Sequence, residues 1–293
     1  MQNATKIKSI IYIVIAASLW GMISLFNRVL TNCGMGQIEI VFVKSAAAAV
    51  TTFIYVYLKN KNMLRIKLKD LWCFIGTGIL SLLFFNICYF YAMQENISAA
   101  AVLLYTAPAF VVVLSVFLFK ERLTTAKIVS LVLITVGCVF VTGILSSSAV
   151  HISTACVLFG IGSGIGYALY SIFGRYALNK GYSSETISLY TFILSAIGAL
   201  PLINLCSVAS KINTVSVLGI LGIGILCCFL PYLFYTKGLA GVKTGEASVI
   251  ATVEPVVATV ISIILGDSFG WNTALGIILV LSGILVISFD NKS

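Results

Sequence analysis

The segment Thr252–Ser268 reads TVEPVVATVISIILGDS, and 147 residues earlier Tyr105–Glu121 reads YTAPAFVVVLSVFLFKE. A second pair of segments aligns at the same shift, because Trp20–Arg28 reads WGMISLFNR and Tyr167–Arg175 reads YALYSIFGR. Apolar helices resemble one another by chance, but chance does not hold one shift across two separate motifs. The sequence therefore predicts an internal repeat, with one copy in each half of the chain.

The composition indicates that the protein folds in lipid. Of the 293 residues, 60% are apolar and only 9% are charged. Soluble domains carry about 25% charged residues and about 45–50% apolar ones. A soluble chain this apolar could not cover its own surface with polar groups, so we expect an integral membrane protein.

Ten apolar runs are long enough to be transmembrane helices, which need about 20 residues to cross the hydrocarbon core. Strands of a membrane β-barrel would alternate apolar and polar residues, whereas these runs are continuously apolar. We therefore predict an all-α polytopic membrane protein with ten transmembrane helices. The runs are Ile10–Arg28, Ile38–Leu58, Leu71–Met93, Ile97–Phe119, Ile128–Leu145, Thr154–Tyr176, Thr186–Leu205, Val215–Tyr235, Ala247–Leu265 and Ala274–Phe289.

The basic residues predict the orientation in the membrane, because Lys and Arg concentrate in cytoplasmic gaps. If the N-terminus is cytoplasmic, 15 of the 18 lie on the inside, and the exceptions are Arg28, Lys44 and Lys211. The first apolar run lacks a small-residue cleavage site and is interpreted as a retained helix. We expect a multi-pass protein of the cell (inner) membrane with both termini in the cytoplasm. The net charge of +9 is thus explained without nucleic acid.

The repeat divides the chain into residues 1–147 and 148–293, with five spans in each half. Five is odd, so the second half must enter the membrane from the opposite side. Inverted repeats of this kind build transporters, since two similar halves can exchange inward-open and outward-open shapes around a central site. The prediction is a secondary transporter that works by alternating access.

Several motifs carry a family resemblance: Trp20-Gly21 in the first span, Pro108 followed by FLFKERLT (Phe117–Thr124), and Glu254-Pro255 followed by ILGDSFG (Ile264–Gly270). The chain resembles the EamA-type branch of the drug/metabolite transporter superfamily over nearly its whole length. The resemblance implies two five-helix repeats around a central cavity lined by spans 1–4 and 6–9. It also implies export of amino acids or similar small metabolites. The family usually has Glu where this chain has Asp267, a change that preserves the charge.

Two ionisable residues lie well inside predicted spans, Lys44 and Glu254. Charges within the membrane are costly and usually face a cavity or a partner. Glu254 could take up a coupling proton, bind a substrate ammonium, pair with Lys44, or fix a helix kink by a hydrogen bond. Lys44 could bind a substrate carboxylate, or its long side chain could reach the interface.

Further candidates for substrate binding are polar or aromatic residues near mid-span. Tyrosine and tryptophan normally favour the membrane interfaces, so at mid-depth their polar groups need partners. They could line the cavity or pack between helices. These candidates are Trp20, Asn86, Tyr89, Tyr105, Tyr167, Tyr170 and Tyr232. Pro108 and Pro255 lack the N–H donor and are predicted to break their helices.

Other functions find little support in the sequence. The eight cysteines form no CxxC or Cys/His metal pattern, and no GxxxxGK[ST] nucleotide loop occurs. The only histidine, His151, lies in a predicted gap, so a membrane-embedded enzyme is disfavoured and neither a cofactor nor a metal is expected. A channel or facilitative pore stays as the alternative function. The expected partners are a small-molecule solute and the lipid bilayer, and both a monomer and a homodimer stay open.

Overall fold

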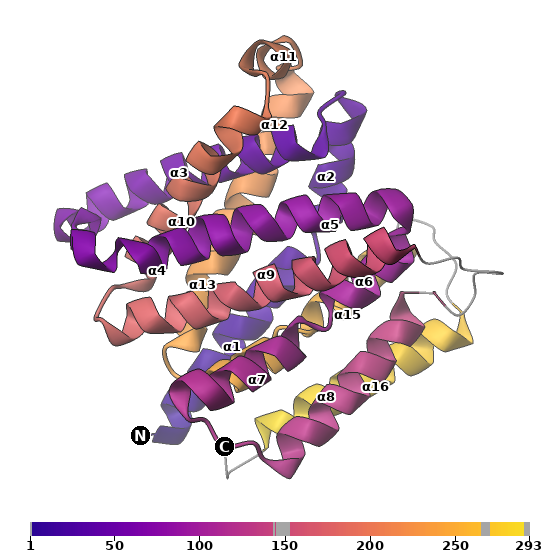
Figure 1. Ribbon diagram of the computed structural model, residues 1–293. Helices are drawn as coiled ribbons and strands as arrows, with labels where there is room; N and C mark the ends of the chain where they lie inside the picture. The colour runs from indigo at the N-terminus through magenta and orange to yellow at the C-terminus, as the bar shows by residue number, and fades with distance from the viewer. Residues whose placement is uncertain (1, 143, 145–152, 265–269, 290–293) are drawn as a thin grey trace.

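The computed structural model describes residues 2–142, 144, 153–264 and 270–289, and every regular element in these residues is a helix (Figure 1). The all-helical prediction is confirmed. Asp267 and His151 lie outside the described residues, as do the predicted span ends at Leu145 and Leu265.

Within the described ranges, nine helical segments are long and apolar enough to cross a membrane. They are Thr5–Asn32, Gln37–Lys59, Leu68–Glu95, Ile97–Phe119, Thr154–Asn179, Ser184–Leu202, Thr214–Leu239, Thr244–Ile264 and Trp271–Ser288. A tenth apolar helix, α8 (Thr125–Val141), has 17 residues, about 25 Å at 1.5 Å per residue. The chain is a multi-span membrane protein, while the count of ten spans stays a prediction.

Three of these spans are broken near their middle. The first consists of α1 (Gln2–Trp20) and α2 (Ile23–Asn32), the fourth of α6 (Ile97–Leu104) and α7 (Ala107–Phe119), and the ninth of α14 (Thr244–Ile250) and α15 (Val253–Ile264). Each break is two residues long: Gly21–Met22, Tyr105–Thr106 and Ala251–Thr252.

The prolines lie just after the breaks. Pro108 is the second residue of α7 and Pro255 is the third residue of α15. The first turn of a helix tolerates proline, because its N–H groups have no partner within the helix anyway. At the other break, a Cβ atom on Gly21 would lie 2.9 Å from Val257 Cβ. Only glycine allows α1 and α15 to approach so closely there.

Two further spans contain a π-helical segment in their middle. Gly76–Leu83 (η3) lies between α4 (Leu71–Ile75) and α5 (Phe84–Glu95), and Ile225–Phe229 (η6) lies between α12 (Thr214–Gly224) and α13 (Leu230–Leu239). Such segments are rare and are frequent at functional sites. Each rotates the following helix relative to an undisturbed α-helix.

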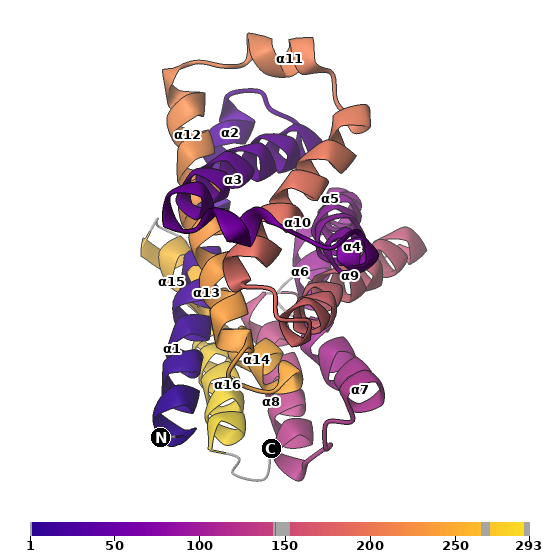
Figure 2. The ribbon, with the colours of Figure 1, turned by 90° about the vertical axis from the view of Figure 1, so that its left-hand side faces the viewer.

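The two halves of the chain interdigitate (Figures 1 and 2). The most extensive helix pairings join α8 to α16 (Trp271–Ser288), α3 (Gln37–Lys59) to α10 (Ser184–Ala199), α5 to α9 (Thr154–Asn179), and α1 to α13. Each pair takes one helix from either half. The remaining described elements are short connections: η1 (Lys61–Leu64), η2 (Leu68–Asp70), η5 (Leu200–Leu202) and α11 (Leu205–Ser210).

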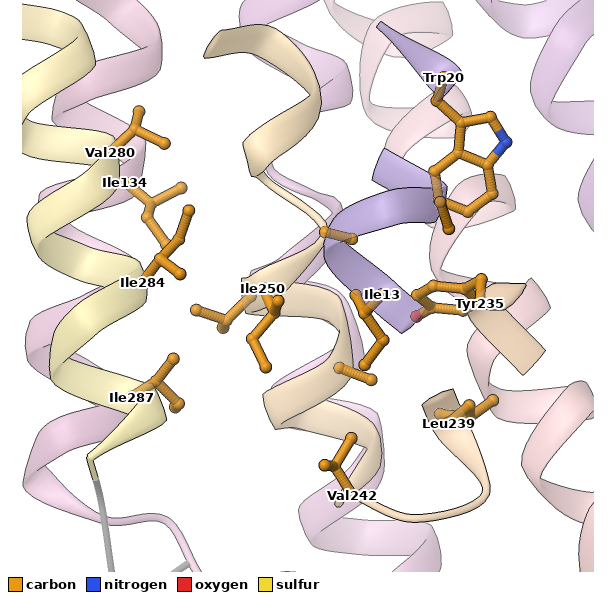
Figure 3. Packing of buried hydrophobic residues seen from close by; sticks show 14 of the residues in the cluster. Ile13, Trp20, Ile134, Tyr235, Leu239, Val242, Ile250, Val280, Ile284 and Ile287 are labelled. Carbon is orange, nitrogen blue, oxygen red and sulfur yellow. The ribbon is translucent and has the colours of Figure 1, made fainter. Parts of the chain in front are cut away.

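The largest buried cluster joins α1, α13 and α14 to the α8–α16 pair (Figure 3). In that view Ile13 lies between Ile250 and Tyr235, while Ile134 and Ile284 lie close together where α8 meets α16. The outer surface instead exposes large apolar side chains, as expected where lipid is the solvent. Examples are Phe53, Leu158, Leu218 and Leu285.

We expect Gly137→Ala to destabilise the pairing of α8 with α16. The new Cβ atom would lie 2.8 Å from Val280 Cγ2 and 2.9 Å from the backbone oxygen of Gly276, and a backbone cannot move aside. Overpacking of this kind costs about 1–3 kcal/mol. Thermal unfolding of the detergent-purified protein measures the effect as a lowered melting temperature.

Gly174→Ala in α9 is the matched control. Its Cβ atom would lie 3.6 Å from Leu239 Cδ2, an ordinary contact, and alanine is the better helix former by about 1 kcal/mol. This variant should melt at or above the wild-type temperature. Equal loss of stability in both variants would contradict the tight α8–α16 contact.

Candidate functional site

A cavity of about 260 Å³ lies inside the bundle, and helices of both halves line it. The first half contributes α1, α2, α3, α5 and α6, and the second half contributes α9, α13 and α15. Asn27 and Gln37 lie at one end, near the α2–α3 connection, and Asn27 Nδ2 donates to Gln37 Oε1 at 3.1 Å. Glu254 lies at the opposite, deep end, where a second, smaller gap begins.

Eight of the nine predicted binding or coupling residues line this cavity: Trp20, Lys44, Asn86, Tyr89, Tyr105, Tyr167, Tyr232 and Glu254. The ninth, Tyr170, lies outside it and borders a neighbouring gap of about 10 Å³. The Tyr170 hydroxyl group shares a hydrogen bond of 2.8 Å with Thr236 Oγ1. Tyr170 therefore supports the wall behind Trp20 and Tyr167.

The two mid-span charges do not pair with one another. Lys44 is buried, and its Nζ donates to Asn86 Oδ1 at 2.8 Å. Glu254 Oε2 accepts from the Tyr167 hydroxyl at 3.3 Å. Across the described residues, no acid lies within 4.0 Å of Lys44 and no base lies within 4.0 Å of Glu254. One cavity thus holds one basic and one acidic side chain, each contacted by a neutral side chain.

Aromatic rings form the wall between these two charges. The Trp20 ring lies 5.3 Å from Tyr232 and 6.1 Å from Tyr167, both edge-to-face, and Phe85 lies 5.6 Å from Tyr167 in the same geometry. Edge-to-face pairs stabilise such a cluster beyond the burial of area. These packed rings give the wall a largely aromatic surface.

Sequence reasoning missed several lining residues. Asn27 and Gln37 are polar residues near span ends, where polar side chains are common, so neither stood out in the sequence. Cys227 and Cys228 line the cavity from the π-helical segment η6. A π-helical segment has no recognisable hydrophobic period in the sequence. The sequence therefore could not predict that these two cysteines face the cavity.

The bundle is closed beyond Glu254, on the face where the chain begins. The gap next to Glu254, bordered by Tyr105 and Ser248, measures only about 10 Å³, enough for a single water molecule. Further on, Ser171 Oγ and the Tyr235 hydroxyl group lie 2.6 Å apart. Arg175 Nε then donates to Thr244 Oγ1 at 2.9 Å, and Arg175 also donates to the backbone oxygen of Val242.

Glu121 connects α7, α8 and α14 at this closed face through hydrogen bonds and an ion pair. Its Oε1 accepts from the backbone N–H of Thr244 at 2.7 Å, and its Oε2 accepts from Gly245 N–H at 3.3 Å and from Lys127 Nζ at 3.1 Å. Burial raises the pKa of the Glu121 carboxyl, but Lys127 and the two N–H donors outweigh burial and hold that pKa below its usual 4.5. A carboxylate at the start of α14 is also favoured by the helix dipole.

The comparisons with known proteins agree with this arrangement. The model of the EamA-like transporter family matches residues 7–143 and again residues 154–289. This chain belongs to the EamA-like transporter family. The resemblance identified from the sequence motifs is confirmed, and a transporter role is supported.

Individual relatives of this chain are also named as transporters. An uncharacterized transporter of Archaeoglobus fulgidus is 26% identical over 283 residues, which is 94% of this chain and 94% of the relative. The uncharacterized transporter YwfM of Bacillus subtilis is 26% identical over 286 residues, 95% of this chain and 93% of the relative. A solved crystal structure superposes with a TM-score of 0.80 over 95% of both chains at 16% identity, which shows the same fold.

We expect Glu121→Gln to destabilise the closed face. The Lys127 side chain is fully buried, and breaking a buried ion pair by removing one partner costs about 3–5 kcal/mol. The measurement is thermal unfolding of the detergent-purified protein. Between pH 6 and 8 the difference from wild type should be constant, since the carboxylate contributes fully above about pH 4.5. Below that pH the wild type should lose this advantage as Glu121 is protonated.

Glu95→Gln is the control, because Glu95 is exposed and accepts only from Ser153 Oγ, at 2.8 Å, among the contacts described. Exposed substitutions usually change stability by no more than about 0.5 kcal/mol. A Glu121→Gln variant as stable as Glu95→Gln would show that the carboxylate does not hold α14.

Proposed function

We propose that this chain is a secondary transporter for a zwitterionic amino acid or similar small metabolite with an apolar side chain. It works by alternating access and exports its substrate across the cell (inner) membrane. The observation that carries this proposal is the cavity shared by both halves, with Lys44 and Glu254 in its lining and no ion-pair partner for either among the described residues.

Charge complementarity supports the substrate class. Unpaired charges inside a membrane protein are costly, so a ligand that supplies the missing partners gains their interaction. An amino acid carries both partners, since its carboxylate can contact Lys44 and its ammonium group can contact Glu254. Between these groups Trp20, Phe85 and Tyr232 offer apolar surface to a side chain.

Glu254 also suits the coupling of transport to protons. It is the acidic residue in the cavity lining, and it lies at the border between the open cavity and the closed face. A carboxyl group at that border can carry either a proton or a substrate ammonium, and competition between the two would couple their movements. Proton uptake on one side then releases substrate.

Matching irregularities support two inverted repeats, residues 1–147 and 148–293. The helix breaks at Tyr105–Thr106 and Ala251–Thr252 lie 146 residues apart, and the π-helical segments η3 and η6 fall in the third span of each half. The family model also matches once in each half. Helix breaks at equivalent places around a central site are typical of inverted-repeat transporters.

The open and closed faces support alternating access. The cavity extends to the face of the α2–α3 connection, while Glu121, Arg175 and α14 close the other face. If the N-terminus is cytoplasmic, this is the outward-open shape. By the repeat symmetry, the inward-open shape would open the α14 side and close the Asn27–Gln37 side.

Substrate binding should depend on both charges of the ligand. We expect leucine to bind the purified wild type at least tenfold more tightly than isoamylamine, which lacks the carboxylate, or isocaproate, which lacks the ammonium group. A charged hydrogen bond contributes about 1.5–3 kcal/mol. Lys44→Met should bind leucine no more tightly than isoamylamine, while it still prefers leucine to isocaproate. Glu254→Gln should bind leucine no more tightly than isocaproate, while it still prefers leucine to isoamylamine. Ligand-dependent thermal shifts measure these affinities.

Lys8→Met is the control, since Lys8 is exposed on α1 and far from the cavity lining; it should keep both preferences. Loss of both preferences in either cavity variant would contradict the assignment of one charge to each ligand group. In liposomes, counterflow separates a carrier from the alternative channel, because only a carrier shows faster uptake with substrate on the far side.

The proposed orientation is tested by native Cys206, which is exposed in α11 at the end of the molecule far from the N-terminus (Figure 2). A membrane-impermeant maleimide should label Cys206 in intact cells. A cysteine introduced by Lys61→Cys, in a Cys206→Ser background, should react only after permeabilisation. Labelling of Cys206 only from the cytoplasmic side would reverse the orientation.

A further inference from the structure

A second cavity, separate from the central one, lies at the end of the bundle where α3 is joined to α4 and α9 to α10 (left side of Figure 1). Its volume is about 520 Å³. The residues that line it are Asn62, Met63, Arg65, Ile66, Lys67, Lys180, Gly181, Tyr182, Ser183 and Thr186. The first five of these ten residues belong to the first half of the chain, and the other five belong to the second.

The second half holds the α3–α4 connection in place. Thr186 Oγ1 donates to the backbone oxygen of Met63 at 2.8 Å, and the Tyr190 hydroxyl donates to that of Leu64 at 2.7 Å. The backbone N–H of Lys67 donates to the Tyr182 hydroxyl at 3.0 Å. Three hydrogen bonds therefore fix the backbone of an exposed connection, so its side chains start from defined positions.

Arg65 and Lys67 project from the same side of this connection. Both have extended backbone angles, and alternate residues of an extended segment point to the same side. Ile66, between them, packs against the buried cluster that contains Phe74. Throughout the described part of the chain, no acid lies within 4.0 Å of Arg65 or Lys67.

Lys180 supplies a third cation from the α9–α10 connection. Its Nζ lies 2.7 Å from Asp70 Oδ1, and the Tyr182 hydroxyl donates to Asp70 Oδ2 at 2.8 Å. Asp70 positions Lys180 and offsets one positive charge of the three. The cavity therefore keeps a net positive charge, with Lys180–Asp70 as the one ion pair that its lining residues make among the described residues.

Exposed apolar side chains adjoin these cations. The cavity lies where the candidate span Leu68–Glu95 begins and where the span Thr154–Asn179 ends. At that level Leu68 is 83% exposed and Trp72 is 43% exposed, and Lys180 Nζ lies over the Trp72 ring at 5.8 Å. Cations beside an exposed apolar surface at a span end match the headgroup and chain of a lipid.

We propose that this second cavity binds an anionic phospholipid, with the headgroup phosphate between Arg65, Lys67 and Lys180 and the acyl chains along Leu68 and Trp72. The guanidinium group of Arg65 can contact two phosphate oxygens at once. A lipid bound there connects the two halves of the chain. Free phosphate would offer the same anion but would leave the apolar surface uncovered.

The test is binding of phosphatidylglycerol to the full-length protein, purified in a neutral detergent, by native mass spectrometry and by thermal shift. Wild type should retain phosphatidylglycerol in preference to phosphatidylcholine, and inorganic phosphate should give no comparable stabilisation. The double variant Arg65→Gln/Lys67→Gln should weaken binding roughly thirtyfold, because each cation near an anionic headgroup contributes about 1 kcal/mol.

Lys61→Gln/Lys69→Gln is the matched control, because it removes the same charge from the same connection at positions that do not line the cavity. This variant should bind phosphatidylglycerol as wild type does. Equal weakening in both double variants, equal retention of phosphatidylcholine, or full stabilisation by inorganic phosphate would each overturn the proposal. Transport by the central cavity does not enter the readout, so this proposal and the proposed function can fail separately.

Discussion

In lipid, a backbone that leaves the helical ladder has no water to satisfy its N–H and C=O groups, so it can break only inside the protein or beside a cavity. This constraint governs the molecule, because three of its spans break near their middle. At two of the breaks a threonine hydroxyl takes up a carbonyl group: Thr106 Oγ1 donates to Leu103 and Thr252 Oγ1 donates to Val249. Each break has at least one residue that lines the central cavity or the small gap below Glu254. Broken helices and cavity are thus one feature of the fold.

The short helix α14 connects the closed face to the deep end of the cavity. Its first N–H groups bind Glu121, and its last turn leads through Ala251–Thr252 into α15 and Glu254. A helix of seven residues spans about 10 Å and moves as a rigid unit. Glu121 and Arg175 at the closed face are therefore joined to Glu254 by one short helix and a two-residue break.

The sequence predicted the charged residues of the site and the family of the protein. It did not predict the exact helix breaks, the π-helical segments or the long-range contacts of Glu121. Lys44 and Glu254 stood out because charges are rare in apolar runs, and the family motifs identified the class of protein. The positions of the helix breaks followed the prolines only approximately, because proline fits the first turn of the new helix as well as the break itself. Cys227 and Cys228 reach the cavity through a π-helical segment, which no hydrophobic period encodes. The role of Glu121 depends on N–H groups 123 and 124 residues away.

The two cavities share one property, because each is lined by residues from both halves of the chain. The central cavity has Lys44 on the first half and Glu254 on the second, and the second cavity has Arg65 and Lys67 on the first half and Lys180 on the second. A ligand that contacts both halves stabilises the arrangement in which its contacts are close together. The proposed substrate and the proposed lipid would therefore both act on the placement of one half against the other. A lipid bound between residues 65–67 and 180 would give the halves a common anchor at one face, about which the proposed change of access would take place.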